Sequence, residues 1–275
     1  MSTIPSVPPP LPPPLPVEPG TPPVSLDSKA INSSAFTSHI CKWASEYPPL
    51  WEAAAKYNIC TTKPPFKFKY KNYDSIIQIG PTCGLVALSM LVNGDVTPDE
   101  LLSISKLEGY TCNGEMLSCK NMTKLMEKVL SLAELDNVKY SVKTGGLYSD
   151  ETIEKLLNGA AILVAYDADC NHSPCLRRGH TAHWALVCGV VVIEDPAGNS
   201  YTSNPNNIHV FTRHGKSKYI AIWKLEDLEK SNKNLWEFSP KKNADGMIYA
   251  HPDGGLGGDD GLRDQYLIIE DKIYT

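Results

Sequence analysis

The sequence predicts an α+β fold in which a helical half, with a central cysteine-bearing helix, packs on an antiparallel β-sheet. Between residues 36 and 158, apolar residues recur at three-to-four spacing, which is the period of amphipathic helices. From residue 160 onward they alternate with polar residues or form short runs between polar turns, which is typical of strands. Helices followed by strands, without an internal repeat, indicate an α+β domain.

The helical half contains several distinct start and stop signals. Residues 36–57 place Ala, Trp and Leu at helical spacing on both sides of a Pro-Pro pair, so they predict two short helices. Thr97 begins a capping box before the next helix. Further amphipathic helices are expected over residues 118–135 and 149–159. The run "CGLVALSMLV" is apolar on nearly all sides, so it predicts a buried central helix that begins at Cys83.

The strands are predicted from alternation and from β-branched or aromatic composition. The basic and aromatic segment "KPPFKFKYKNYDSIIQIG" is interpreted as a half-exposed strand, because the acidic balance of the chain disfavours nucleic-acid stacking. The other expected strands are "VKYSVKT", "AAILVAYDA", "HWALVCGVVVIED", "IHVFTRH", "KYIAIW" and "QYLIIED".

The first 35 residues are expected to form a proline-rich leader, separate from a globular domain over residues 36–275. Proline fixes φ and removes the amide donor, so the leader predicts an extended polyproline II segment. It is either a stiff solvated spacer or a ligand for an aromatic groove of the SH3, WW or profilin type. Triple prolines separated by leucine, without a flanking arginine, favour profilin. The expected contact residues are Pro8, Pro9, Pro10, Leu11, Pro12, Pro13, Pro14, Leu15 and Pro16.

Composition excludes several classes of function. The net charge of −5 gives no general attraction to nucleic acid or to an anionic membrane. No apolar run approaches the roughly 18–20 residues that span a bilayer. The N-terminus lacks the charged and apolar regions of a signal peptide. We therefore expect a cytoplasmic protein without nucleic-acid or membrane partners, and we expect its eight cysteines to be reduced.

The stretch "IIQIGPTCGLVAL" places Cys83 at the expected start of the central helix. A thiol at a helix N-terminus faces unpaired amides and the positive end of the helix dipole, which favours the thiolate. Gln78 precedes it by five residues (83 − 78), so its side-chain amide and the Cys83 amide are candidates to bind an oxyanion. The alternative is that Cys83 is an inert buried cysteine.

His183 is the candidate base for Cys83. It opens an apolar strand beside Trp184, where its ring can face a helix start, as a thiol–imidazole pair requires. The third, orienting residue is less well defined. Asp195 ends the same strand, but twelve residues (195 − 183) separate it from His183. His214, or a backbone carbonyl near it, is the alternative.

A competing site lies in "DCNHSPCLRRGHTAH", which is rich enough in cysteine and histidine to suggest zinc. Its spacing matches no usual zinc finger or ribbon. A zinc ion there would also take His183 away from Cys83, so the two hypotheses exclude each other. The expectation is therefore that there is no metal. The residues concerned are Cys170, His172, Cys175, His180 and His183.

Four segments resemble the actin maturation protease family: "IQIGPTCGLVALSML", "GHTAHWALVCGV", "HGKSKYIAIW" and "SNKNLWEFSPKKNADGMIYAHPDGGL". The resemblance covers about Phe36 to Ile269, and the proline-rich leader is also a feature of the family. It implies a papain-like fold related to the bacteriocin-leader peptidases. It maps the nucleophile to Cys83 and the base to His183, and Gln78 matches the oxyanion-hole glutamine in type and offset. Asp195 does not map cleanly.

The resemblance also implies an activity and two partners. The chain would be a cysteine aminopeptidase that removes an N-acetylated first residue, Met or Cys, from immature actin. It would use no cofactor, and its leader would engage profilin. Two alternatives remain: another papain-like hydrolase, such as an isopeptidase or amidase, or a non-catalytic adaptor that binds profilin.

Overall fold

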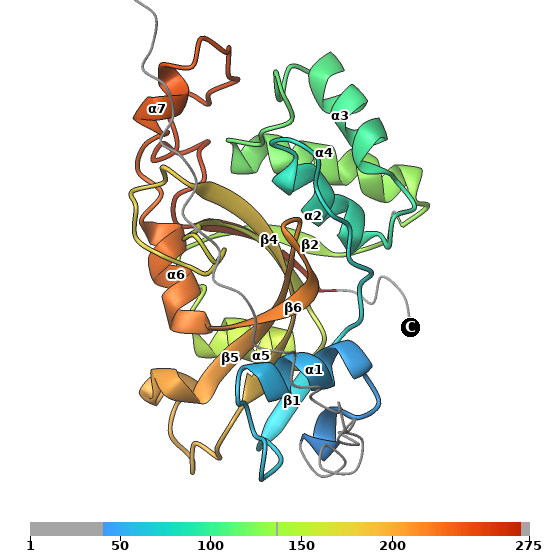
Figure 1. Ribbon diagram of the computed structural model, residues 1–275, viewed down its shortest axis with the longest axis vertical. Helices are drawn as coiled ribbons and strands as arrows, with labels where there is room; N and C mark the ends of the chain where they lie inside the picture. Colours follow the sequence, from blue (N-terminus) through green and yellow to red (C-terminus); the bar gives the residue numbers. More distant parts are fainter. Residues whose placement is uncertain (1–40, 136, 271–275) are drawn as a thin grey trace, which may run out of the picture. The chain divides into compact units, whose positions relative to one another are not determined.

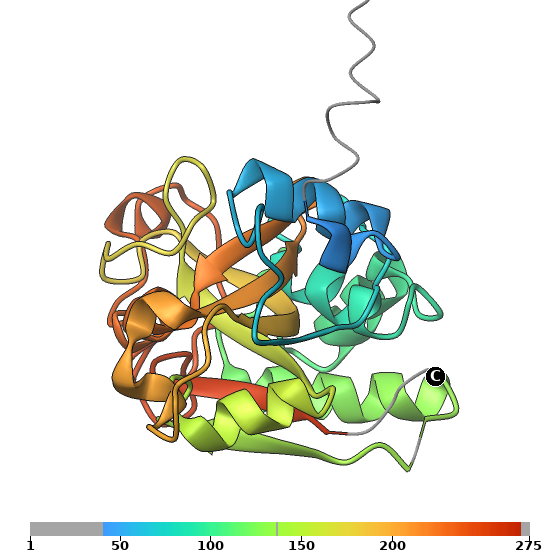
Figure 2. The same cartoon turned by 90° about the horizontal axis from the view of Figure 1, so that it is seen from below.

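One antiparallel sheet of seven strands organises the part of the chain that the structure describes, residues 41–135 and 137–270 of a computed structural model (Figure 1 and Figure 2). The order is β2-β7-β3-β4-β5-β6, and β1 pairs with β4. The strands are β1 Lys67–Tyr70, β2 Tyr140–Thr144, β3 Ala161–Asp167, β4 Ala182–Val192, β5 Ile208–His214, β6 Ser217–Lys224 and β7 Gln265–Ile269. The proline-rich leader and the expected boundary after residue 35 lie outside these ranges.

Seven α-helices accompany the sheet in the described ranges. They are α1 Pro48–Lys56, α2 Cys83–Leu91, α3 Pro98–Leu107, α4 Cys119–Leu132, α5 Asp150–Leu157, α6 Leu225–Lys233 and α7 Pro240–Asn243. The capping box of α3 forms as predicted: the amide of Glu100 donates to the Thr97 hydroxyl, and the Thr97 amide donates to the Glu100 carboxylate. The α+β class and the antiparallel sheet are confirmed.

Both faces of the sheet are covered, whereas the sequence predicted one helical half. Alternate residues of the strands enter two separate apolar clusters. The first cluster contains apolar residues of α1 to α4, and the second those of α5 and α6. Figure 1 shows α2, α3 and α4 on one side of the sheet and α6 on the other. Helix α6 was not predicted, because it is highly charged and contributes only two buried leucines, Leu225 and Leu228.

Helix α2 is the central helix that the sequence predicted. Every residue from Gly84 to Leu91 is buried, so the helix lies within the first apolar cluster. Burying each leucine contributes roughly 1.5–3 kcal/mol, which fixes the helix firmly. Glycine is required at position 84, because a Cβ there would lie 2.8 Å from Met122 Cε and 2.9 Å from Met116 Cβ. The fold therefore holds the start of α2, and with it Cys83, in a fixed place.

Strand β4 begins near the start of α2, and it carries His183 there. Its first half pairs with β3, where His183 lies opposite Tyr166. After an irregularity between Val187 and Gly189, its second half pairs with β1. Residue 189 is glycine because a Cβ would collide with the Lys69 carbonyl oxygen.

The buried carboxylate of Asp167 organises the loop that leads into β4. It accepts hydrogen bonds from the amides of Arg177, Gly179 and Thr181 and from the Thr181 hydroxyl. Its side chain is fully buried, and four donors satisfy its charge. The loop ends one residue before β4, so Asp167 helps to set the position from which His183 projects.

We expect Asp167→Asn to lower the free energy of unfolding by about 2–4 kcal/mol. The asparagine nitrogen would face amides that need an acceptor. Urea unfolding of the full chain measures the change. The control is Asp169→Asn, a partly exposed loop residue whose carboxylate accepts two loop amides. Equal losses in the two variants would contradict the organising role of Asp167.

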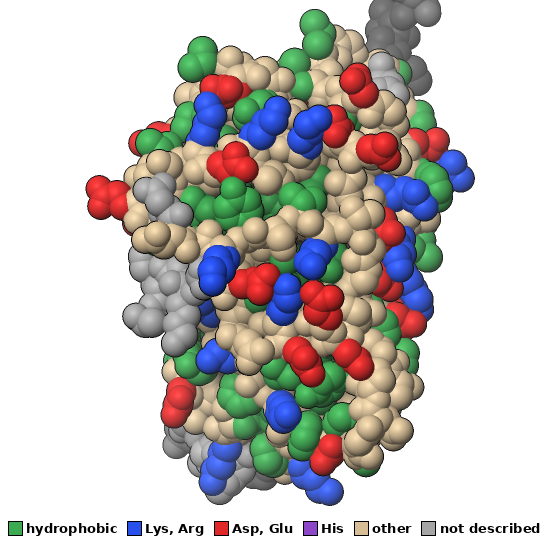
Figure 3. Space-filling model, turned by 180° about the vertical axis from the view of Figure 1, so that it is seen from behind, with side chains coloured by type: hydrophobic (Ala, Val, Ile, Leu, Met, Phe, Trp, Pro, Cys, Tyr) green, Lys and Arg blue, Asp and Glu red, His purple; other side chains and the backbone are tan. Residues whose placement is uncertain are grey.

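Two features of the described residues bear on membrane and nucleic-acid binding: the length and apolarity of the helices, and the distribution of surface charge. None of the described helices combines the length and apolarity needed to cross a bilayer. On the face shown in Figure 3, basic and acidic side chains are interspersed, so that face offers no extended surface of one sign. All eight cysteines are free thiols.

Candidate active site

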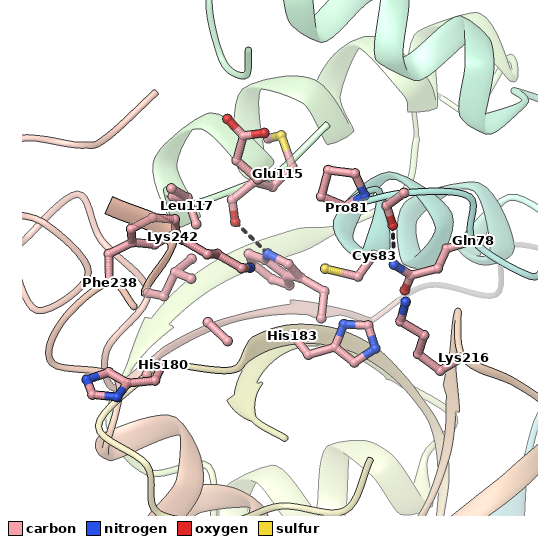
Figure 4. Close-up of a pocket in the computed structure, with 16 residues that line it drawn as sticks. Gln78, Pro81, Cys83, Glu115, Leu117, His180, His183, Lys216, Phe238 and Lys242 are labelled. Carbon is pink, nitrogen blue, oxygen red and sulfur yellow. Dashed lines mark hydrogen bonds between the residues drawn. The ribbon is translucent and has the colours of Figure 1, made fainter. Parts of the chain in front are cut away.

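A cavity of about 160 Å³ lies where α2, β4 and the β5–β6 turn meet (Figure 4). It contains Cys83, His183 and Gln78, three of the four residues that the sequence proposed for catalysis. The other lining residues come from six segments of the chain. They are Gly80, Pro81, Glu115, Met116, Leu117, Gly179, His180, Ala182, Trp184, Lys216, Phe238, Lys242 and Leu262.

Cys83 is the first residue of α2, as predicted, but Thr82 does not cap the helix with its side chain. The Thr82 hydroxyl donates instead to the Ile79 carbonyl oxygen, 2.9 Å away. The amides of the first turn therefore remain available to a ligand at the helix start. The amides of Trp184 and Gly84 point toward the Cys83 sulfur.

The surroundings of Cys83 act on its pKa in the direction opposite to the one that the helix start alone predicts. Desolvation raises the pKa of Cys83 above the usual value for a cysteine. The Trp184 and Gly84 amides and the charges of Lys242 and Lys216 act in the opposite direction, but they do not outweigh it.

His183 is a neutral base. Its side chain is 6% exposed, and burial lowers its pKa to about 3, helped by nearby His214 and by other cationic groups. Its Nε2 is buried and has no hydrogen-bond partner within the described ranges. Figure 4 shows the ring lying next to the Cys83 side chain. Trp184 holds this strand start in place, because its indole Nε1 donates to the Met116 carbonyl oxygen at 2.8 Å.

A neutral thiol beside a neutral imidazole has a defined chemistry. The imidazole can take the thiol proton as the sulfur attacks a carbonyl carbon, so that charge develops only during the reaction. This is general-base activation rather than a preformed ion pair.

Gln78 lies beside Cys83 with its amide orientation fixed. Its Nε2 donates to the Gly80 carbonyl oxygen at 2.7 Å, which leaves a second N–H for a ligand. Its backbone amide donates to the Gly215 carbonyl oxygen at 2.8 Å. Gly215 also makes room for the side chain, because a Cβ there would lie 2.9 Å from Gln78 Cβ.

The structure does not bring Asp195 to the site. Asp195 follows the far end of β4, and its carboxylate accepts a hydrogen bond from the Ala197 amide in an exposed turn. The neighbours of the His183 ring are instead aromatic: Tyr166 at 5.8 Å and His214 at 6.0 Å between ring centroids. Of the alternatives that the sequence left open, His214 is the one beside His183.

The five residues of the competing zinc hypothesis do not form a metal site. His180 Nε2 lies 3.0 Å from Glu237 Oε1, and Cys170 is exposed. Within the described ranges, no three histidine, cysteine or acidic side chains are placed to hold a metal ion.

Sequence reasoning missed several lining residues. Lys216 follows β5 in the turn before β6, and Lys242 lies in α7. Neither has a local motif, because only the fold brings them to the pocket. The segment "HGKSKYIAIW" was noted for its resemblance, and that was the one available signal for Lys216.

The fold and the pocket define a class of protein: an α+β chain whose helix-start cysteine and strand-start histidine share one cavity, as nucleophilic thiol catalysis requires. A family model described as "Actin maturation protease-like, C-terminal domain" matches residues 73–191, which include both residues. Together with a curated relative that is 38% identical over 98% of this chain, this match shows that the chain belongs to the actin maturation protease family.

Curated relatives agree over most of the chain. The actin maturation protease of Drosophila melanogaster is 38% identical over 269 residues, which cover 98% of this chain and 95% of the relative. The mouse protein of the same name is 34% identical over 71% of this chain and 61% of its own length. The human protein is 33% identical over 71% of this chain and 63% of its own length. The match therefore spans a little over three fifths of the two mammalian relatives.

Proposed function

We propose that this chain is a cysteine aminopeptidase that removes the N-acetylated first residue, Met or Cys, from immature actin. The observation that carries the proposal is the shared cavity of Cys83 and His183, in a chain whose relatives are named actin maturation proteases. Acetylation removes the charge of the terminal amine, so an aminopeptidase that binds a free ammonium group cannot recognise this substrate. A thiol that attacks the carbonyl of the acetylated residue does not need that amine.

The first half-reaction forms a thioester. His183 takes the Cys83 proton while the sulfur bonds to the carbonyl carbon of the acetylated residue. The Gln78 side-chain amide and the Cys83 amide donate to the resulting oxyanion. The intermediate then expels the actin amine as the C–N bond breaks, and His183 returns the proton to that amine.

The second half-reaction restores the thiol. His183 takes a proton from water as the water oxygen attacks the thioester carbonyl. The C–S bond breaks, the acetylated amino acid leaves, and Cys83 recovers its proton from His183. Each proton and each electron pair is accounted for without a cofactor.

The size of the cavity supports release of a single residue. About 160 Å³ is small beside the roughly 300–1,000 Å³ of common ligand sites. Leu117, Phe238 and Leu262 supply apolar lining, which suits a short uncharged acyl group. We propose that this apolar lining leaves room for only one residue of the substrate before the scissile bond. Release of a dipeptide from acetylated actin would count against this proposal.

Intact mass spectrometry tests the proposed function. Unprocessed N-acetylated actin is incubated with the chain, with and without a chelator, and the expected result in both cases is loss of one acetylated residue. Loss that requires metal would support the zinc alternative. No loss from acetylated actin, with turnover of another amide or isopeptide substrate, would favour a different papain-like hydrolase. No turnover of any such substrate would favour the adaptor.

We expect Gln78→Ala to lower kcat by about 10²- to 10³-fold with little change in KM, because an oxyanion donor acts mainly in the transition state. Gln78→Glu keeps the shape but loses the N–H donors, so it should fail similarly. The control is Asn72→Ala, in the same extended segment but outside the cavity. Full activity of both Gln78 variants would show that Gln78 does not take part in catalysis.

We also propose that the leader, through Pro8 to Pro16, binds profilin in the cytoplasm and so presents actin to the site. The support is its composition: triple prolines separated by leucine are the kind of sequence that aromatic grooves of the profilin type bind. Calorimetric titration of profilin into the full chain and into a chain lacking residues 8–16 tests this. Equal affinity for the two chains would contradict it.

A further inference from the structure

Two lysines bracket the thiol in the cavity. Lys216 lies in the turn that joins β5 and β6, and Lys242 lies in α7. In the view of Figure 4 they extend from opposite sides of the Cys83 sulfur. Their charges act on the site, because both lower the pKa of Cys83 and both lower the pKa of His183. Both side chains are exposed, so they can reach a ligand at the mouth of the cavity.

These charges are not neutralised by the protein. Within the described ranges, neither lysine has a carboxylate within ion-pair distance, and the nearest aromatic contact is Lys242 Nζ over the Phe238 ring at 5.7 Å. Two carboxylates are nearby, but other groups engage them. Glu115 accepts the amides of Cys112 and Asn113 at 3.2 and 2.9 Å. Asp245 accepts a hydrogen bond from the Tyr249 hydroxyl at 2.6 Å. Lys242 acts on Asp245 only through its charge, which helps to lower the pKa of Asp245.

We propose that Lys216 and Lys242 select substrates whose residues directly after the scissile bond are acidic. This rests on the proposed function, in which the acyl group held in the cavity is one acetylated residue. An acetylated Met or Cys is uncharged. Any negative charge in the substrate that attracts the two lysines must therefore lie in the leaving polypeptide. Lysine suits the task, because its flexible stem lets one ammonium group meet carboxylates of different length.

The lysines have a second effect that must be separated from selection. Two positive charges near Cys83 also stabilise the thiolate and the oxyanion for every substrate. Neutralising a lysine therefore lowers the rate on any peptide. The quantity that reports selection is the ratio of kcat/KM for an acidic peptide to kcat/KM for the matching amide peptide.

The experiment uses two acetylated peptides that begin with Met and differ only after it, with Asp residues in one and Asn residues in the other. We expect the full chain to favour the acidic peptide by about tenfold or more at low salt, and to lose this preference as salt rises. Lys216→Gln and Lys242→Gln should each lower the ratio about three- to fivefold, and the double variant should bring it near one. The matched controls are Lys218→Gln and Lys241→Gln, which remove the same charge one or two residues away from the cavity lining.

A binding measurement separates this inference from the proposed function. Fluorescence anisotropy of both peptides on the Cys83→Ala protein reports the preference even if no peptide is cleaved. Absence of cleavage of peptide and acetylated actin alike would count against the proposed function. Equal binding and equal turnover of the two peptides, or a ratio that the double variant leaves unchanged, would overturn the role of the lysines.

Discussion

We expect Cys83→Ala to lower the turnover of N-acetylated actin by about 10⁴-fold or more, because the acyl-enzyme cannot form without the sulfur. Cys83→Ser should fail nearly as completely, because a serine hydroxyl is a far weaker acid and a poorer nucleophile than the cysteine thiol. Intact mass spectrometry of the actin product measures the loss. It also detects the mass of an acetyl-Met or acetyl-Cys thioester on the wild type if deacylation is slow.

The control for Cys83→Ala is Cys112→Ala, which removes an exposed thiol outside the cavity lining and should keep full activity. The defect must also occur in folded protein, so thermal unfolding of the Cys83 variants is compared with the wild type. Wild-type rates in folded Cys83→Ala would refute the thiol mechanism.

We expect His183→Gln to lower kcat by about 10³- to 10⁴-fold, because the proton of Cys83 then has no acceptor. Steady-state kinetics at neutral pH measures this. The control is His209→Gln: His209 also has a lowered pKa, about 4, but it lies on β5 opposite Val191, away from the cavity. It should keep full activity, and an equal loss in the two variants would indicate general damage to the fold.

The same two variants should share an effect on stability. Burial lowers the pKa of His183 from 6.5 in the unfolded chain to about 3 in the folded one. The neutral buried ring therefore contributes its full stability above pH 6.5. That contribution is lost as the pH falls toward 3, by about 1.4 kcal/mol per pH unit, because the unfolded state binds the proton first. His183→Gln and His209→Gln should each reduce this acid sensitivity in urea unfolding between pH 7 and pH 4.5, although only the first reduces activity.

Much of the fold could be predicted because its signals are local. The capping box at Thr97 and the short apolar runs of β3 to β7 can be recognised within their own segments. Helix α6 was missed because its leucines are few, and its burial depends on the second face of the sheet. Periodicity within one segment cannot reveal which faces of a sheet will be covered.

The candidate site also contains residues that local sequence signals predict and features that only the folded chain reveals. Cys83, Gln78 and His183 were found because each stands beside a turn, a helix start or a strand start that the sequence shows. Asp195 was the least well supported candidate, because twelve residues of one predicted strand already separated it from His183, and the structure places it in an exposed turn beyond β4. The charge state of Cys83 was also misjudged: the helix start is visible in the sequence, whereas the desolvation that opposes it appears only in the folded chain.

The raised pKa of Cys83 has a consequence for the survival of the protein under oxidative stress. Peroxides and small alkylating agents react with the thiolate, and a thiol with a raised pKa presents little of it. Proton transfer to His183 becomes favourable only as a carbonyl carbon receives the sulfur electrons, so reactivity is tied to the presence of substrate. Without substrate, this protein should therefore lose activity more slowly in a given oxidant than an enzyme whose resting nucleophile is a thiolate.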